Sequence, residues 1–312
     1  MRLSDLQARF GIPGIVSFQQ QANGLVFVDI RTELARARVH LQGAHLVDWT
    51  PRAQRPVFFL SATTAFELRR AIRGGVPICF PWFGPHPTDP AAPAHGPARL
   101  HDWSLAQVER LTDGSLALDF DFPSAAFAAA RLPAGLRVQY RVAIGTTLSL
   151  MLEVANESPE VFTFEEALHP YFALGDIGQI SVSGTEGATY ADKTDGMRWK
   201  RQSTEALGIS RETDRVYLDT VSTCCIDDRQ WQRRIVVEKA GSATTVIWNP
   251  WRERAAAIAD LGPEQWRSFV CIEPANAMDN AITLQPGERH RLQTRIRVEP
   301  SASASAGTRG RA

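Results

Sequence analysis

Strict alternation of apolar and polar side chains is the feature that most constrains the fold of this chain. Three alternating segments lie in the middle of the sequence and one lies near its end. Their apolar residues are Leu116, Leu118, Phe120 and Phe122; Leu136, Val138, Tyr140, Val142 and Ile144; Leu148, Leu150, Leu152 and Val154; and Leu292, Ile296 and Val298, which share a face with Thr294. A period of two predicts strands with one buried face, as in an antiparallel sheet.

Shorter apolar runs predict further strands at 25–30, 56–60, 179–184, 234–239, 244–248 and 268–273. Helical signals are few. They predict a short helix at 4–10 capped by Ser4, a helix or a loop at 123–132, and one turn of helix at 262–268. Many short strands between Gly, Pro and Asp turns are typical of a sandwich or barrel. Without a linker or a fixed repeat, we expect one all-β domain over residues 1–300 and a disordered tail over 301–312.

The charge balance argues against large polyanionic partners. The 312 residues contain 34 Lys and Arg against 34 Asp and Glu, so the net charge is zero. Binding to nucleic acid or to a membrane surface is therefore not expected, although one or two placed arginines suffice for a phosphorylated small molecule. The N-terminus lacks the apolar core of a signal peptide, and no apolar run approaches a membrane span. We expect a cytoplasmic monomer.

The four cysteines do not indicate a metal centre. They form no CxxC pair, and the adjacent Cys224 and Cys225 would point to opposite faces of a strand. We expect reduced, mostly buried thiols.

Segment 72–86, IRGGVPICFPWFGPH, breaks the alternation and combines Arg73 with two glycines, Gly74 and Gly75. Glycine permits backbone angles and close approaches that other residues resist. The neighbouring Trp82 and Phe83 suit a stacking wall for a sugar ring, or alternatively a rigid loop whose aromatic rings join the core.

Segment 94–103, AHGPARLHDW, places His95, Arg99 and His101 close together. The spacing matches neither HxxxH nor HExxH, so hydrogen bonding to ligand hydroxyls or phosphate suits these residues better than zinc. The arginines Arg73 and Arg99 could instead pair with a structural carboxylate such as Asp89 or Asp102.

Two further segments place a titratable residue beside a proline at the end of a predicted strand. His169 lies in FTFEEALHPYF, and Glu273 lies in VCIEPANA. A lone histidine is more often structural than catalytic, but a carboxylate that ends a buried strand costs free energy unless it is paired or used. Between these segments, ETDRVY (212–217) and VIWNPW (246–251) place polar side chains beside aromatic ones.

Six motifs in order resemble those of the hexose-6-phosphate mutarotases, the glucose-6-phosphate 1-epimerase branch of the aldose 1-epimerase superfamily. They are RGGVPICFPWFG, HGPAR, EEALHPYF, DRVY, WNPW and FVCIEPA, and they span roughly residues 70 to 280. Two positions depart from the family pattern: Pro97 replaces an aromatic residue, and Ala94 stands where a polar residue often contacts substrate.

The resemblance implies a galactose mutarotase-like supersandwich of twisted antiparallel sheets. It also implies His169 as general acid and Glu273 as general base, with Arg73, Arg99 and Asp214 binding the substrate; His95 and Trp82 are added from their segments. The expected substrate is a hexose 6-phosphate, and no cofactor or metal is expected.

Anomer exchange requires a base that takes the proton of the C1 hydroxyl and an acid that protonates the ring oxygen as the C1–O5 bond opens. His169 and Glu273 suit these roles, and we expect them to face each other across one pocket at about the width of a sugar ring. Three alternatives remain open: a non-catalytic carbohydrate-binding sandwich, a glycosidase that uses Glu273 with Asp214, and a zinc or iron enzyme built on the histidines.

Overall fold

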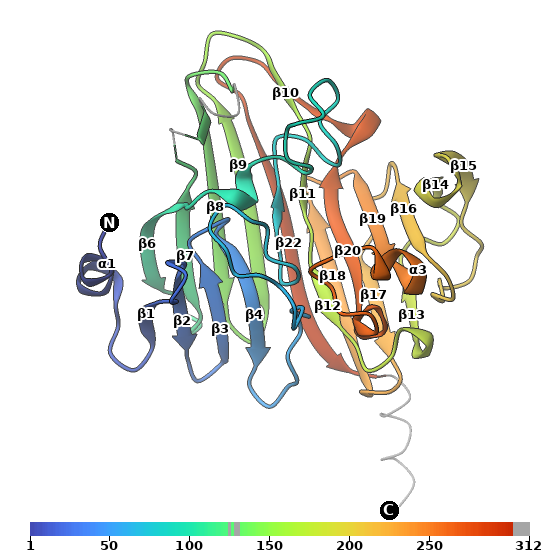
Figure 1. Ribbon diagram of the computed structural model, residues 1–312, viewed down its shortest axis with the longest axis horizontal. Helices are drawn as coiled ribbons and strands as arrows, with labels where there is room; N and C mark the ends of the chain where they lie inside the picture. The colour runs from blue at the N-terminus through green and yellow to red at the C-terminus, as the bar shows by residue number, and fades with distance from the viewer. Residues whose placement is uncertain (124–125, 128–131, 302–312) are drawn as a thin grey trace, which may run out of the picture.

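The computed structural model describes residues 1–123, 126–127 and 132–301. Strands dominate it and form two eight-stranded sheets, one four-stranded sheet and one two-stranded sheet (Figure 1). Every pair of neighbouring strands in these sheets is antiparallel. The predicted all-β, antiparallel fold class is therefore confirmed.

One eight-stranded sheet, which we call the back sheet, has the strand order β13-β17-β18-β22-β9-β8-β7-β6. Its strands are β6 (Ser104–Arg110), β7 (Leu116–Asp121), β8 (Leu136–Ile144), β9 (Leu148–Asn156), β13 (Ile180–Ser183), β17 (Cys224–Asp228), β18 (Arg233–Ala240) and β22 (Arg289–Pro300). The four segments with strict alternation form β7, β8, β9 and β22. Their alternate apolar side chains, such as Leu118, Val142, Leu152 and Ile296, are completely buried.

The other eight-stranded sheet, which we call the site sheet, has the order β15-β14-β16-β19-β20-β11-β5, and β12 also pairs with β20. Its strands are β5 (Ile78–Cys79), β11 (Glu166–Leu168), β12 (Tyr171–Ala173), β14 (Thr189–Asp192), β15 (Arg198–Arg201), β16 (Thr213–Tyr217), β19 (Thr244–Asn249) and β20 (Phe269–Asn276). The smaller sheets contain β1 (Val16–Gln20), β2 (Val26–Arg31), β3 (Ala35–His40) and β4 (His45–Pro51), and β10 (Phe162–Phe164) with β21 (Ile282–Leu284).

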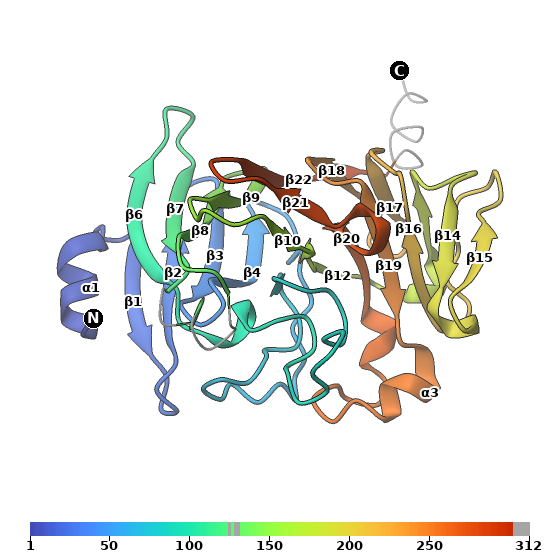
Figure 2. The same cartoon turned by 90° about the horizontal axis from the view of Figure 1, so that it is seen from above.

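The sheets form two layers with a common apolar core. Figures 1 and 2 show β1–β4 over one half of the back sheet and β16, β19 and β20 over its other half. An isolated bridge between Leu46 and Val76 connects β4 to the segment before β5, so the front layer is nearly continuous. Buried residues from all the large sheets belong to one hydrophobic cluster. This is the sandwich that the resemblance implied.

The helices are short and differ from prediction at several places. The α-helices are α1 (Leu3–Phe10) and α3 (Trp251–Ala256), and the 3-10 helices are Ala98–Leu100, Ile177–Gln179, Lys193–Asp195, Gln265–Ser268 and Met278–Asn280. The predicted cap at Ser4 is wrong, because Arg2 is the N-cap and pairs with Asp5. Helix α3 was not predicted, since it follows Pro250 in a polar stretch without a clear apolar period.

Some predicted elements are absent or lie outside the described residues. Segment 56–60 is not a regular strand, because Phe58 and Leu60 form only isolated bridges with Phe172 and Gly74. This prediction from an apolar run was wrong. Segment 123–132 lies mostly outside the described residues, as does the tail after Ser301.

The adjacent glycines Gly74 and Gly75 lie where their backbone packs very closely against neighbouring segments of the front layer. Their φ angles are 116° and 62°, in the region that disfavours other residues. A Cβ atom at Gly74 would lie 2.3 Å from the carbonyl oxygen of Phe59, and one at Gly75 would lie 2.3 Å from that of Leu46. Both glycines therefore adopt angles and close approaches of the kind expected from the sequence, and their packing fixes the path that leads from Arg73 into β5.

Candidate active site

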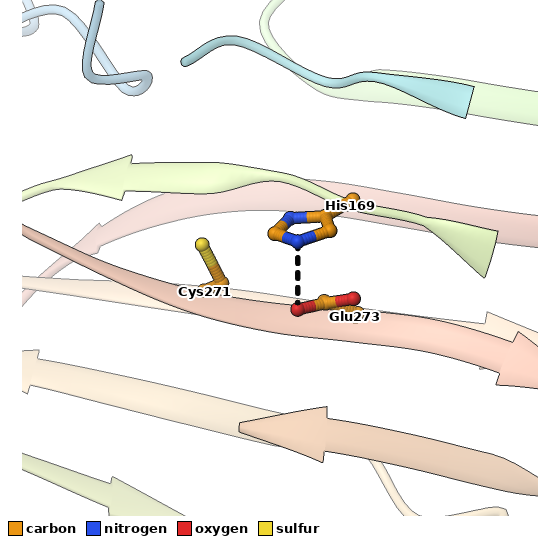
Figure 3. A group of neighbouring side chains, drawn as sticks. All are labelled: His169, Cys271 and Glu273. Carbon is orange, nitrogen blue, oxygen red and sulfur yellow. Dashed lines mark ion pairs between the residues drawn. The ribbon is translucent and has the colours of Figure 1, made fainter. Parts of the chain in front are cut away.

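Strand register brings His169 and Glu273 together. Strand β11 pairs Ala167 with Ala275 of β20, and β12 pairs Tyr171 with Cys271 of β20. Both pairings follow the same register, so His169, between β11 and β12, lies directly opposite Glu273. Its Nε2 is 3.2 Å from Oε1 of Glu273 (Figure 3).

The side chains of this pair point away from the back sheet. Glu166 of β11 has the opposite orientation, because alternate strand residues face opposite sides. Its Oε1 lies 3.0 Å from Nε2 of His290 on β22, in the back sheet. His169 and Glu273 therefore lie on the outer face of the site sheet.

Strands β19 and β16 extend the same face beyond β20. Val246 lies opposite Glu273, and Trp248 lies opposite both Cys271 and Asp214. Together with neighbouring loops, this face forms a pocket of about 330 Å³. Its lining residues are Arg73, Phe83, Ala94, His95, Arg99, His169, Tyr171, Lys193, Glu212, Asp214, Val246, Trp248, Arg254, Ile258 and Glu273.

Six of the seven predicted site residues line this pocket: Arg73, His95, Arg99, His169, Asp214 and Glu273. The seventh, Trp82, does not. Its Nε1 donates to the carbonyl oxygen of Pro93 at 2.9 Å, and its ring packs edge-on against His86. The adjacent Phe83 lines the pocket instead, and its backbone N–H donates to Oε2 of Glu165 at 2.9 Å.

The distance between the two proposed catalytic groups also differs from expectation. We expected His169 and Glu273 to be separated by the width of a sugar ring, but they are in direct contact at 3.2 Å. The cause is their position opposite each other on adjacent chain segments, since paired residues on one sheet face lie closer than a sugar ring is wide. A molecule that reaches both groups would therefore have to approach them from the pocket side.

Burial shifts the pKa values of this pair in opposite directions. It raises the pKa of Glu273 well above its ordinary value, and the charge of Asp214 raises it further. Burial also lowers the pKa of His169, with smaller contributions from His95 and Arg99. A carboxylate with a raised pKa is a stronger base, and an imidazolium with a lowered pKa is a stronger acid.

His95 contributes a defined hydrogen-bond donor. Its Nδ1 accepts a hydrogen bond from the backbone N–H of Gly84 at 3.2 Å, which assigns the proton of the neutral ring to Nε2. Burial lowers the pKa of His95 to about 3, so the ring is neutral at physiological pH. Its ring packs edge-on against both Phe83 and His169.

The two predicted arginines have different surroundings. Arg73 donates from Nε to Oδ1 of Asp260 and from Nη1 to the hydroxyl of Tyr171, both at 3.1 Å. Its carboxylate partner is thus Asp260, and neither Asp89 nor Asp102. Arg99 donates from Nη2 to the carbonyl oxygen of Ala94 at 2.8 Å. Its Nε is buried without a partner, and no carboxylate of the described residues lies within ion-pair distance of it.

Comparison with known proteins places this chain in a family. Residues 27–297 match the family model described as aldose 1-epimerase. The chain belongs to the aldose 1-epimerase family. It is therefore an isomerase of the epimerase class.

Individual relatives agree with this assignment. A protein of Escherichia coli (strain K12), provisionally named glucose-6-phosphate 1-epimerase, is 34% identical over 263 residues, which cover 84% of this chain and 87% of the relative. A protein of Cenchrus ciliaris with the same provisional name is 31% identical over 277 residues, which cover 86% of this chain and 83% of the relative. The crystal structure of the provisionally named mutarotase YeaD from Salmonella typhimurium superimposes with a TM-score of 0.86 at 29% identity, covering 96% of this chain and 99% of that one.

In this aldose 1-epimerase family member, several pocket residues were not predicted: Tyr171, Lys193, Glu212, Trp248 and Arg254. Tyr171 and Trp248 lie inside two of the six motifs. Tyr171 is two residues after His169, and Trp248 is paired with Asp214, so each shares a sheet face with a predicted site residue and could have been predicted. Lys193 and Arg254 lie in surface segments without such a signal.

Lys193 holds Asp214 in place. Its Nζ lies 3.2 Å from Oδ2 of Asp214 and 5.7 Å from the centre of the Phe83 ring. Burial raises the pKa of Asp214, and the nearby Lys193 opposes that shift. The epimerase thus presents a charged pair at one wall of its pocket.

Two findings complete the description of this epimerase. Among the described residues, no helix is both long and apolar enough to span a bilayer. Within the same residues, one group of three potential metal ligands has its donor atoms within 4.8 Å of one another: His169, Cys271 and Glu273.

Proposed function

We propose that this epimerase interconverts the α and β anomers of a hexose 6-phosphate by opening and reclosing the sugar ring, without a cofactor. The observation that carries the proposal is the buried contact between His169 and Glu273 in a pocket lined by four cationic side chains. The provisional names of the relatives support glucose 6-phosphate as the substrate.

Ring opening needs two proton transfers. Glu273 takes the proton of the C1 hydroxyl, and His169 gives a proton to the ring oxygen as the C1–O5 bond breaks. The product is an open-chain aldehyde, a protonated Glu273 and a neutral His169. Each positioned group typically contributes about 10²–10⁴-fold in rate.

Ring closure reverses these transfers on the other face of the aldehyde. Rotation about the C1–C2 bond presents that face to the C5 hydroxyl. As the C1–O5 bond reforms, the C5 hydroxyl returns its proton to His169, and Glu273 returns its proton to the C1 oxygen. Both groups regain their starting protonation state, so the cycle consumes no other reagent.

The contact distance suits this cycle. Because His169 and Glu273 touch at 3.2 Å, the C1 hydroxyl and the ring oxygen, which are bonded to the same carbon, can lie against the pair from one side. The Nε2 hydrogen of His95 and the carboxylate of Asp214 provide further hydrogen-bonding groups in the same pocket for the remaining hydroxyls.

The cationic lining favours an anionic substrate. Four cationic residues, Arg73, Arg99, Lys193 and Arg254, outnumber the three carboxyl groups of Glu212, Asp214 and Glu273 in the lining. Lys193 and Arg73 already contact carboxylates. Arg99 has a buried Nε without a partner, and we assign it the principal contact with the phosphate, with Arg73 in a supporting position.

The test is an anomerisation assay by magnetisation-transfer NMR on glucose 6-phosphate and on free glucose. We expect the protein to accelerate exchange strongly for the phosphate and weakly for free glucose. Equal acceleration would contradict the assignment of the phosphate. Binding without acceleration would indicate a carbohydrate-binding sandwich, and cleavage of aryl glycosides would indicate a glycosidase.

A further inference from the structure

A third side chain, which has no role in the proposed proton transfer, lies beside His169 and Glu273. Cys271 lies on β20 two residues before Glu273, so both side chains face the same side of the strand. One donor atom from each of His169, Cys271 and Glu273 lies within 4.8 Å of the other two. Figure 3 shows the thiol and the carboxylate beside the imidazole ring.

These side chains have unused capacity to bind a ligand. Oε2 of Glu273 is buried without a hydrogen-bond partner among the described residues, and Cys271 is a free, fully buried thiol. Buried polar atoms without partners are costly, and those that remain call for an explanation. A cation bound between the three side chains would give the Glu273 carboxylate and the Cys271 sulfur a partner at the same point.

The donor set indicates which cation fits. One imidazole nitrogen, one thiolate and one carboxylate oxygen are ligands that zinc accepts, whereas Mg²⁺ and Ca²⁺ prefer oxygen alone. A thiolate and a carboxylate carry two negative charges together, so the complex with Zn²⁺ is neutral overall. Neutrality matters because the group is buried, where a net charge would be expensive. His169 and Glu273 also line the pocket, which gives the ion a route from solvent.

We propose that His169, Cys271 and Glu273 form a zinc-binding site that inhibits the enzyme. Zn²⁺ binds Nε2 of His169, the carboxylate of Glu273 and the thiolate of Cys271, and the protons of the thiol, of protonated Nε2 and of any protonated Glu273 leave to solvent. Bound metal therefore removes both the acid and the base. The binding claim stands on geometry alone, while the inhibition rests on the proposed function.

Metal binding is tested directly, without reference to activity. The full-length protein, first treated with a chelator, is titrated with Zn²⁺ alone against a chromophoric zinc indicator and with Co²⁺ alone in the spectrophotometer. We expect one ion per chain and a thiolate-to-cobalt charge-transfer band. Cys271→Ser should abolish the band and weaken binding by about tenfold or more, as loss of a ligand costs at least as much as loss of a supporting group.

Cys79→Ser is the matched control, since Cys79 is also fully buried in the site sheet but lies outside the donor group. Cys225→Ser controls for a partly exposed thiol. Both variants should keep the band and the affinity. No binding by the wild type, or loss of the band in a control variant but not in Cys271→Ser, would overturn the site.

Inhibition is tested in the anomerisation assay. Zn²⁺ should inhibit the wild type, a chelator should reverse the inhibition, and Cys271→Ser should need a higher zinc concentration by the same factor as its loss of affinity. Stoichiometric binding without inhibition would overturn the inhibitory role. If the metal-free wild type shows no anomerisation, the proposed function fails, while the cobalt and zinc titrations still decide the site.

Discussion

Arg73 and Asp260 are separated by 187 positions in the sequence, yet the Nε and Nη2 of Arg73 both lie 3.1 Å from Oδ1 of Asp260. The carboxylate side chain is only 14% exposed, so the arginine is its main source of countercharge. A phosphate that approaches Arg73 must compete with Asp260, and it meets no such competitor at Arg99. The two arginines should therefore respond differently to mutation.

We predict that Arg99→Ala lowers kcat/KM for a hexose 6-phosphate by about ten- to 150-fold, because a charge-assisted hydrogen bond contributes about 1.5–3 kcal/mol. The loss should largely vanish with the free hexose, which has no phosphate to bind. Steady-state kinetics on both substrates measures the difference. Equal losses on the two substrates would mean that Arg99 holds the sugar ring or the fold.

Arg73→Ala should lower stability as well as activity. It leaves the carboxylate of Asp260 without its countercharge, at a cost of about 1–3 kcal/mol. Thermal unfolding of Arg73→Ala, Asp260→Ala and the double variant measures the coupling. We expect the double variant to be more stable than the sum of the single losses implies, and strictly additive losses would show that the pair does not contribute to the fold.

His169→Asn and Glu273→Gln should each lower kcat by about 10²-fold or more, because each removes one positioned proton-transfer group. Both replacements keep a similar shape, so circular dichroism should show an intact fold. Anomerisation at wild-type rates in either variant would remove that residue from the mechanism.

Activity should persist after exhaustive chelation, since the proposed reaction needs only proton transfer between the sugar and two side chains. The measurement is the exchange rate before and after treatment with EDTA and removal of the chelator. If activity disappears and a divalent ion restores it, the cofactor-free mechanism is wrong.

His40 should make stability depend on pH. Burial, and secondarily Arg38, lowers its pKa to about 4 from an ordinary value of 6.5. The unfolded chain binds the proton more strongly, so the contribution of neutral His40 is complete above about pH 6.5 and is lost as the pH falls toward 4. Melting temperatures measured across this range should fall less in His40→Phe than in the wild type.

Phenylalanine suits this position because both ring nitrogens of His40 lack partners among the described residues and its ring lies 5.3 Å from that of Phe66. His45→Phe is the contrasting variant. It removes a 2.8 Å hydrogen bond between Nε2 of His45 and the carbonyl oxygen of Gly74, so it should lower the melting temperature at every pH. An unchanged pH slope in His40→Phe would exclude His40 as the source.

Alternation made four strands of the back sheet predictable, β7, β8, β9 and β22, because alternate side chains in them face the core. The run at 56–60 misled for the opposite reason: Phe58 and Phe59 are buried by tertiary packing rather than by regular pairing. The six motifs contain all seven predicted site residues, and six of these line the pocket. They could not separate Trp82 from Phe83, since both are aromatic and their orientation depends on a contact between Phe83 and Glu165, 82 residues away.

Contacts between distant segments also account for the site residues that were missed. Lys193 reaches the pocket because β14 pairs with β16, which places the segment after β14 beside Asp214. Asp260 was not expected as the partner of Arg73, because its loop has no motif and only the folded chain brings it near. Strand pairing of this kind is not encoded in local sequence.

The outer face of the site sheet carries its chemistry on residues of a single parity, odd-numbered in β20 and even-numbered in β16 and β19. Deletion of one residue from β20 before Glu273 would rotate Glu273 into the layer now occupied by Ile272, and it would bring Pro274 toward the pocket. Loops around the pocket, such as the one that carries Ala94, face no such restriction. Lineages of this enzyme should therefore tolerate insertions and deletions in those loops while strand β20 keeps a constant length.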